Sequence, residues 1–199
     1  MSDERTAFAN ACRKAGLAFM RGVALGWDET DLETWRCEQY GKLATQTRDV
    51  FIMTPARISA AAVIPPLSDL LRETRWRAFA ALEEAAAGHA RFVQQVAGER
   101  LIARDVQLGW VPVDRKGTSL RGRVLSLFAV DCLLRPTDYR TLLLVCPRCE
   151  SVVFDADARA QGQCCGDRIV GSGERPSPPR NSDLRRTGPA APEGKERKS

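Results

Sequence analysis

Residues 119–134 read SLRGRVLSLFAVDCLL, and this stretch decides the fold. Its apolar residues fall on most sides of a helix instead of forming one stripe: Leu120, Val124, Leu125, Leu127, Phe128, Val130, Leu133 and Leu134. A helix that is apolar on most sides has to be surrounded by other elements. The stretch therefore predicts a central helix, which ends at Arg135 because the residue before Pro136 resists the helical conformation.

Asp131 lies on the apolar side of this predicted helix that also carries Val124 and Leu127. A carboxylate on such a face must be paired or have a raised pKa. We expect a buried ion pair with Arg135, Arg140 or an arginine from another helix. The alternative is a functional carboxylate.

Helical spacing also dominates the sequence before this stretch. One apolar stripe recurs at three- and four-residue intervals through Phe8, Cys12, Ala15, Phe19 and Val23. Thr30 to Glu33 has the spacing of a capping box and predicts a helix start. Further helices are predicted over residues of about 57–64, 67–87 and 90–104. The sequence predicts a mainly α fold, with a helical domain over residues 1–141.

The C-terminal residues 171–199 differ in composition from the rest. They hold five of the eleven prolines and almost no large apolar side chain, so we expect a disordered Pro/Arg-rich tail. Seven basic and four acidic residues give the tail +3 of the formal net charge of +5. The basic balance is mostly a property of the tail, and it supports nucleic-acid binding only weakly.

Nothing in the sequence predicts a membrane partner. No apolar run approaches the roughly 18 residues of a membrane span. The N-terminus also lacks the basic start and apolar run of a secretory signal. We therefore expect a cytoplasmic protein. Its Ala- and Arg-rich composition is typical of a GC-rich bacterial genome.

Cysteines mark a second region of interest. Cys146-Pro147-Arg148-Cys149 lies between the apolar runs 142–145 and 152–154, which predict the two strands of a hairpin, and the pair Cys164-Cys165 follows. In a reducing cytoplasm such thiols are metal ligands or buried side chains and not disulfides. The spacing predicts a structural metal site. Unliganded thiols are one alternative, and a redox pair is another; the redox pair needs its first cysteine at a helix N-terminus, whereas a strand-like run follows here.

This cysteine segment, residues 142–170, resembles a zinc ribbon, a module built from two CxxC knuckles that are each often followed by glycine. The first knuckle matches, but the second departs because its two cysteines are adjacent. The resemblance implies one structural Zn²⁺ in a β-hairpin module that follows the helical domain. Two ligand sets stay open. The first set is Cys146, Cys149, Cys164 and Cys165. The second set uses Asp167 as the fourth ligand in place of Cys165.

Two basic surfaces are candidate contact sites. The cluster at the start of the central helix predicts an anion or partner contact, and its members are Arg115, Lys116, Arg121 and Arg123. Trp76, among arginines, predicts a partner contact.

The sequence shows no catalytic set. It contains a single histidine, His89, and no phosphate loop or dinucleotide fingerprint. We therefore expect a small zinc-binding protein that contacts another protein in a regulatory or adaptor role, without catalysis. The alternatives are a nucleic-acid-binding regulator, which would use the zinc hairpin and the basic segments, and a metal- or carboxylate-dependent enzyme.

Overall fold

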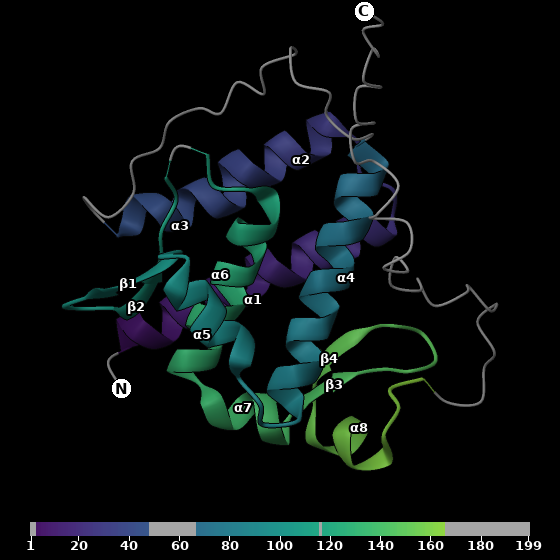
Figure 1. Cartoon of the computed structure of the whole chain (residues 1–199). Coiled ribbons are helices and arrows are strands. Elements are labelled where there is room, and N and C mark those ends of the chain that lie inside the picture. Colours follow the sequence, from purple (N-terminus) through teal and green to yellow (C-terminus); the bar gives the residue numbers. More distant parts are fainter. Residues whose placement is uncertain (1–2, 48–66, 116, 166–199) are drawn as a thin grey trace, which may run out of the picture.

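The computed structural model describes residues 3–47, 67–115 and 117–165 (Figure 1). In chain order its helices are α1 (Asp3–Ala24), α2 (Glu29–Trp35), the π-helix η1 (Arg36–Tyr40), α3 (Gly41–Gln46), α4 (Leu67–Ala86), α5 (Arg91–Gly98), α6 (Leu120–Leu134), α7 (Pro136–Thr141) and α8 (Ala156–Gln161). Two antiparallel hairpins join them, β1 (Ile102–Asp105) with β2 (Gly109–Pro112) and β3 (Leu143–Val145) with β4 (Val152–Phe154). The predicted mainly α fold is confirmed.

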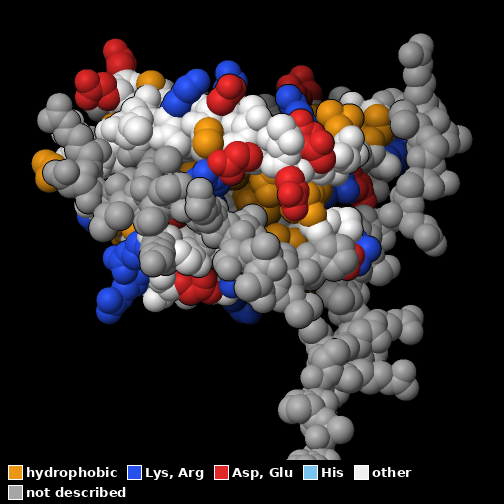
Figure 2. All heavy atoms as spheres, turned by 90° about the horizontal axis from the view of Figure 1, so that it is seen from above, with side chains coloured by type: hydrophobic (Ala, Val, Ile, Leu, Met, Phe, Trp, Pro, Cys, Tyr) orange, Lys and Arg blue, Asp and Glu red, His pale blue; other side chains and the backbone are white. Residues whose placement is uncertain are grey.

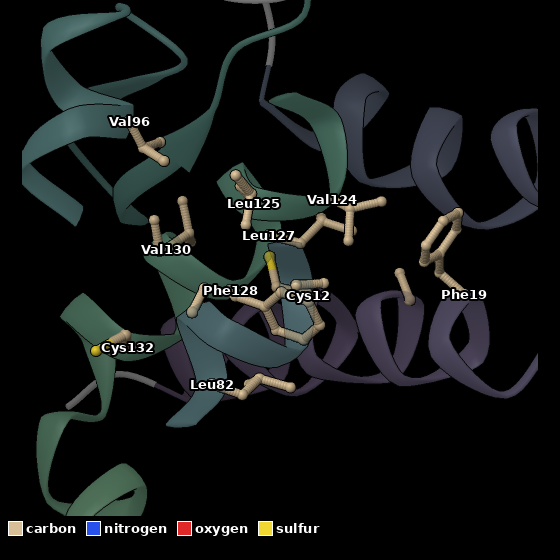
Figure 3. Close-up of a cluster of buried hydrophobic side chains, with 14 of the residues drawn as sticks. Cys12, Phe19, Leu82, Val96, Val124, Leu125, Leu127, Phe128, Val130 and Cys132 are labelled. Carbon is tan, nitrogen blue, oxygen red and sulfur yellow. The ribbon is translucent and has the colours of Figure 1, made fainter. Parts of the chain in front are cut away.

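Helix α6 lies at the centre, with α1, α4, α5 and β2 packed around it (Figure 1). Every residue from Gly122 to Cys132 is buried. Figure 3 shows apolar side chains of α6 gathered with those of the surrounding helices, among them Cys12, Phe19, Leu82 and Val96. The prediction of a central helix is confirmed.

Helix α1 approaches α6 closely because it carries a glycine at the contact. A Cβ on Gly16 would lie 2.7 Å from the ring of Phe128, well inside van der Waals contact. The sequence signal for this approach is Gly16 between the apolar positions of the α1 stripe.

The predicted helix over residues 90–104 is wrong in its second half. Helix α5 ends at Gly98, Arg100 takes a left-handed backbone with φ of 57°, and β1 begins at Ile102. The Asp105 carboxylate accepts hydrogen bonds from the N–H groups of Gln107 and Leu108, both at 2.8 Å, and thereby closes the turn to β2. Side chain to backbone bonds of this kind compete with the helix.

Local capping also differs from the prediction. The N-cap of α2 is Asp28 and not Thr30: the Asp28 carboxylate accepts from the N–H of Asp31 at 2.9 Å, and the Asp31 carboxylate accepts from the N–H of Asp28 at 3.2 Å. Aspartates at both positions form the reciprocal bonds expected of threonine and glutamate.

The remaining predictions divide between the described and the undescribed residues. Residues 136–141 form helix α7, and helix α8 lies between β4 and Cys164. The hairpin shares the helical core, because Leu143 is fully buried in it; the domain boundary between residues 141 and 142 stays a prediction. The predicted helix 57–64, Lys116, Asp167 and the predicted disordered tail 171–199 lie outside the described residues. Within the described part, no helix combines the length and apolar character that crossing a bilayer requires.

Candidate metal centre

The first two cysteines lie on the turn that joins β3 to β4. Two backbone hydrogen bonds of 2.9 Å close this turn, from the N–H of Cys146 to the carbonyl of Ser151 and from the N–H of Glu150 to the carbonyl of Cys146. Strand register continues from Val145 opposite Val152. We call residues 146–151 the knuckle. Its tight reversal places both sulfurs on the same side of the turn.

Helix α8 returns the chain to the knuckle. The Asp155 carboxylate caps the helix by accepting from the N–H of Ala158 at 2.7 Å. Gly162 ends it with a left-handed backbone, φ of 70°, which favours glycine. Adjacent side chains on an extended strand point in opposite directions, whereas this helix end and the bend at Cys164-Cys165 direct both thiols toward the knuckle.

Four thiols meet at this place. The Sγ atoms of Cys149 and Cys164 are 3.4 Å apart, and those of Cys146 and Cys165 are 3.7 Å apart. The Sγ atoms of Cys146, Cys149 and Cys164 all lie within 4.8 Å of one another. Among the described residues, these three cysteines are the one set of cysteine, histidine or acidic side chains whose ligand atoms lie close enough together to hold a single metal ion.

These distances fit a tetrahedral thiolate site. Zinc–sulfur bonds of about 2.3 Å in tetrahedral geometry separate neighbouring sulfurs by about 3.8 Å. The sulfurs of Cys146, Cys149 and Cys164 therefore form a candidate metal centre, and the Sγ of Cys165 lies 3.7 Å from that of Cys146. The choice between Cys165 and Asp167 stays a prediction because Asp167 lies outside the described residues.

The thiols differ in their readiness to ionise. Burial disfavours the thiolate of Cys146, but backbone hydrogen bonds, first from Cys164 and then from Cys149, outweigh it and lower the pKa of Cys146 to about 5. Desolvation, and then hydrogen bonding to Cys149 and Cys146, raises the pKa of Cys164 to about 12. The pKa of Cys165 is also raised, and desolvation is the largest cause. A bound dication favours ionisation of the thiols that coordinate it.

Two contacts hold the β3–β4 hairpin against the helices. On one side, the Arg75 guanidinium of α4 pairs with the Glu150 carboxylate of the knuckle at 2.7 Å. On the other side, the Arg13 guanidinium of α1 stacks over the Phe154 ring, 3.9 Å from its centre. Neither contact was predicted from the sequence. The available sequence signal is Glu150, which stands at the position where zinc-ribbon knuckles often have glycine. The backbone of Glu150 is left-handed, with φ of 54°.

Asp131 is fully buried and belongs to a structural ion pair. Its Oδ2 accepts from Nε of Arg13 at 2.7 Å and from the Tyr139 hydroxyl at 2.8 Å. Burial raises the pKa of Asp131, and the charge of Arg13 opposes that rise. The prediction of a partner arginine from another helix is confirmed. Arg13 also reaches Asp138 of α7 at 3.1 Å, so that α1, α6 and α7 share one polar network.

Two arginines of the predicted anion cluster lie in separate ion pairs. Arg123 is buried and pairs with the Asp114 carboxylate at 3.0 Å, so its charge is compensated within the protein. Arg121 lies 3.5 Å from Glu99. Arg115 is exposed, and its backbone N–H donates to Thr118 Oγ1. Trp76 is half-buried, with the guanidinium of Arg77 4.6 Å from its ring centre.

Charges of both signs are interspersed on the face shown in Figure 2, and the described residues there form no continuous basic patch. The described residues of that face therefore offer nucleic acid no extended cationic track.

No protein-family model, curated protein or solved structure matches this chain.

Proposed function

We propose that this chain is a small cytoplasmic zinc-binding protein of bacterial origin that acts by contacting another protein, in a regulatory or adaptor role. The zinc ion has a structural role, as in the zinc ribbons that the segment resembles. The observation that carries the proposal is the convergence of four thiols from the knuckle and the end of α8, with sulfur separations of 3.4 and 3.7 Å.

The donor set supports zinc over other ions. Soft thiolates select zinc, copper(I) or iron–sulfur clusters, while hard cations such as Mg²⁺ and Ca²⁺ prefer oxygen. A site of four protein ligands leaves no open position for a substrate or an activated water, which is the arrangement of structural zinc sites.

The position of Asp131, the carboxylate considered as a functional group from the sequence, supports a non-catalytic role. Asp131 is committed to Arg13 and Tyr139 in the core and is closed to solvent. The nucleic-acid alternative is weakened because Arg121 and Arg123, two of its four clustered cations, lie in ion pairs. Contact with a protein remains the function that the helical body and its metal hairpin support best.

The zinc site is tested by the metal content of the full chain, purified under reducing conditions. We expect about one zinc per chain, lost in Cys146→Ser and kept in the matched control Cys37→Ser, whose thiol is exposed on η1. Cys165→Ser and Asp167→Asn separate the two candidate fourth ligands. A chain that carries no zinc, or a Cys146→Ser variant that keeps it, would contradict the proposal.

Contact with a protein is tested by cross-linking in host cells followed by quantitative mass spectrometry. We expect a protein partner joined to the wild-type chain and lost in Cys146→Ser. A nuclease-sensitive adduct with no cross-linked protein would favour the nucleic-acid alternative instead.

A further inference from the structure

A cavity of about 240 Å³ lies beside the knuckle, where the hairpin meets α1 and α4. Figure 1 shows the β3–β4 hairpin alongside α4, and the knuckle forms one wall of the cavity through Cys149, Glu150 and Ser151. The apolar part of its lining comes from both helices and from β4: Leu17, Met20, Ala24, Phe79, Val152 and Val153.

Two arginines give this apolar cavity a positive rim. Arg75 donates from Nη2 to Glu150, but its Nε is buried and has no hydrogen-bond partner among the described residues. Arg21 lines the opposite wall from α1 and is exposed. Glu150 is the sole acid of the lining, and its carboxylate is already paired with Arg75. A carboxylate on an occupant would complement the guanidinium groups of Arg21 and Arg75 at this rim, since guanidinium groups bind carboxylates in bidentate fashion.

The size of the cavity indicates the kind of occupant. Small-molecule sites usually measure about 300–1,000 Å³, so this cavity falls below that range. A cavity of this size suits one anchoring side chain of a protein partner, which is how interface hot spots fill pockets.

We propose that this cavity receives an apolar side chain that is flanked by an aspartate or glutamate on a partner protein. The apolar side chain lies against Phe79 and Val153, and the acid binds Arg75, with Arg21 contributing at the rim. This inference rests on the proposed function, because it names the chemistry of the protein partner.

The chemistry of the cavity is tested with two matched probes, 4-phenylbutyrate and its uncharged analogue 4-phenylbutyramide. Each is titrated into the full-length, zinc-loaded chain and followed by backbone amide NMR. We expect shifts at the cavity-lining residues, with the carboxylate binding about tenfold or more tightly than the amide. Arg75→Gln should remove this preference. Arg77→Gln, the exposed neighbour that stacks on Trp76, should keep it. Glu150→Gln removes the competing carboxylate and should strengthen binding of 4-phenylbutyrate only.

The protein nature of the occupant is tested with a phage-displayed random peptide library selected on the same loaded chain. We expect enrichment of an aromatic or branched apolar residue next to an acid, displacement by 4-phenylbutyrate, and loss in Val153→Trp, which fills the cavity. Equal binding of the two probes, shifts away from the cavity, or absence of the enriched pair would overturn the inference.

Zinc content, measured on every sample, separates the two proposals. Zinc-loaded chain that binds neither probe contradicts the cavity proposal alone. Chain without zinc that still discriminates the probes contradicts the metal proposal alone.

Discussion

Replacing Arg13 with methionine should lower the free energy of unfolding, because the buried Asp131 carboxylate loses its partner charge. Arg13 is 14% exposed and its Nε donates to Oδ2 of Asp131 at 2.7 Å, while Oδ1 of Asp131 has no hydrogen-bond partner among the described residues. Removing one member of a buried pair typically costs about 3–5 kcal/mol because the remaining charge is uncompensated. The loss of the stacking on Phe154 adds to this cost by about 0.5–1 kcal/mol. We expect the free energy of unfolding to fall by about 3.5–6 kcal/mol in total near neutral pH.

The penalty should also depend on pH, with a definite sign. Burial raises the pKa of Asp131 and Arg13 opposes it, so the substitution raises this pKa further. A carboxyl whose folded pKa exceeds its unfolded value of about 4 stabilises the fold fully only below that unfolded value, and the contribution is lost as the pH rises through the folded pKa. The penalty should therefore be larger at about pH 7 than at about pH 4, and it should change by at most about 1.4 kcal/mol per pH unit.

The assay is urea unfolding of the reduced, metal-loaded chain, followed by tryptophan fluorescence, since Trp35 is buried in the core. Arg72→Met is the matched control: Arg72 is 70% exposed and pairs with Asp69 on the surface of α4, so its loss should cost no more than about 0.5 kcal/mol. The double variant Arg13→Met/Asp131→Leu should regain stability relative to Arg13→Met. A penalty below about 1 kcal/mol, or one that grows as the pH falls, would refute the reasoning.

Three further perturbations test other parts of the structure. Removing the metal with a chelator should lower the Tm measured by calorimetry, and zinc should restore it; an unchanged Tm after complete removal would contradict a structural metal. Gly22→Ala should cost about 1–3 kcal/mol in urea unfolding, because the added Cβ would lie 1.7 Å from the Trp27 ring, while Gly98→Ala, with open space around it, should be neutral or stabilising; equal effects would contradict this packing. Asp114→Ala should cost about 3–5 kcal/mol by leaving Arg123 buried without its partner, and a loss below about 1 kcal/mol in the same assay would show that the pair is not structural.

Helix positions and the knuckle were predictable because their signals are local. The all-round apolar pattern of residues 119–134 predicts the buried α6, and the spacing of Cys146 and Cys149 predicts a turn with two converging sulfurs. The β1–β2 hairpin was missed because it depends on the bonds from the Asp105 carboxylate to the next backbone amides, which a periodicity argument does not contain.

The sequence by itself determined the fold class, the central helix and the identity of four candidate thiol ligands, because periodicity and cysteine spacing act over a few neighbouring residues. Tertiary structure alone decided which arginine compensates Asp131, that Arg123 is buried with Asp114, and that Arg75 holds Glu150 beside a cavity. Those pairings join residues that lie far apart in the chain or on different elements, such as Arg13 with Asp131. They follow from how α1, α4 and the hairpin pack on α6, and that packing is a property of the whole folded chain.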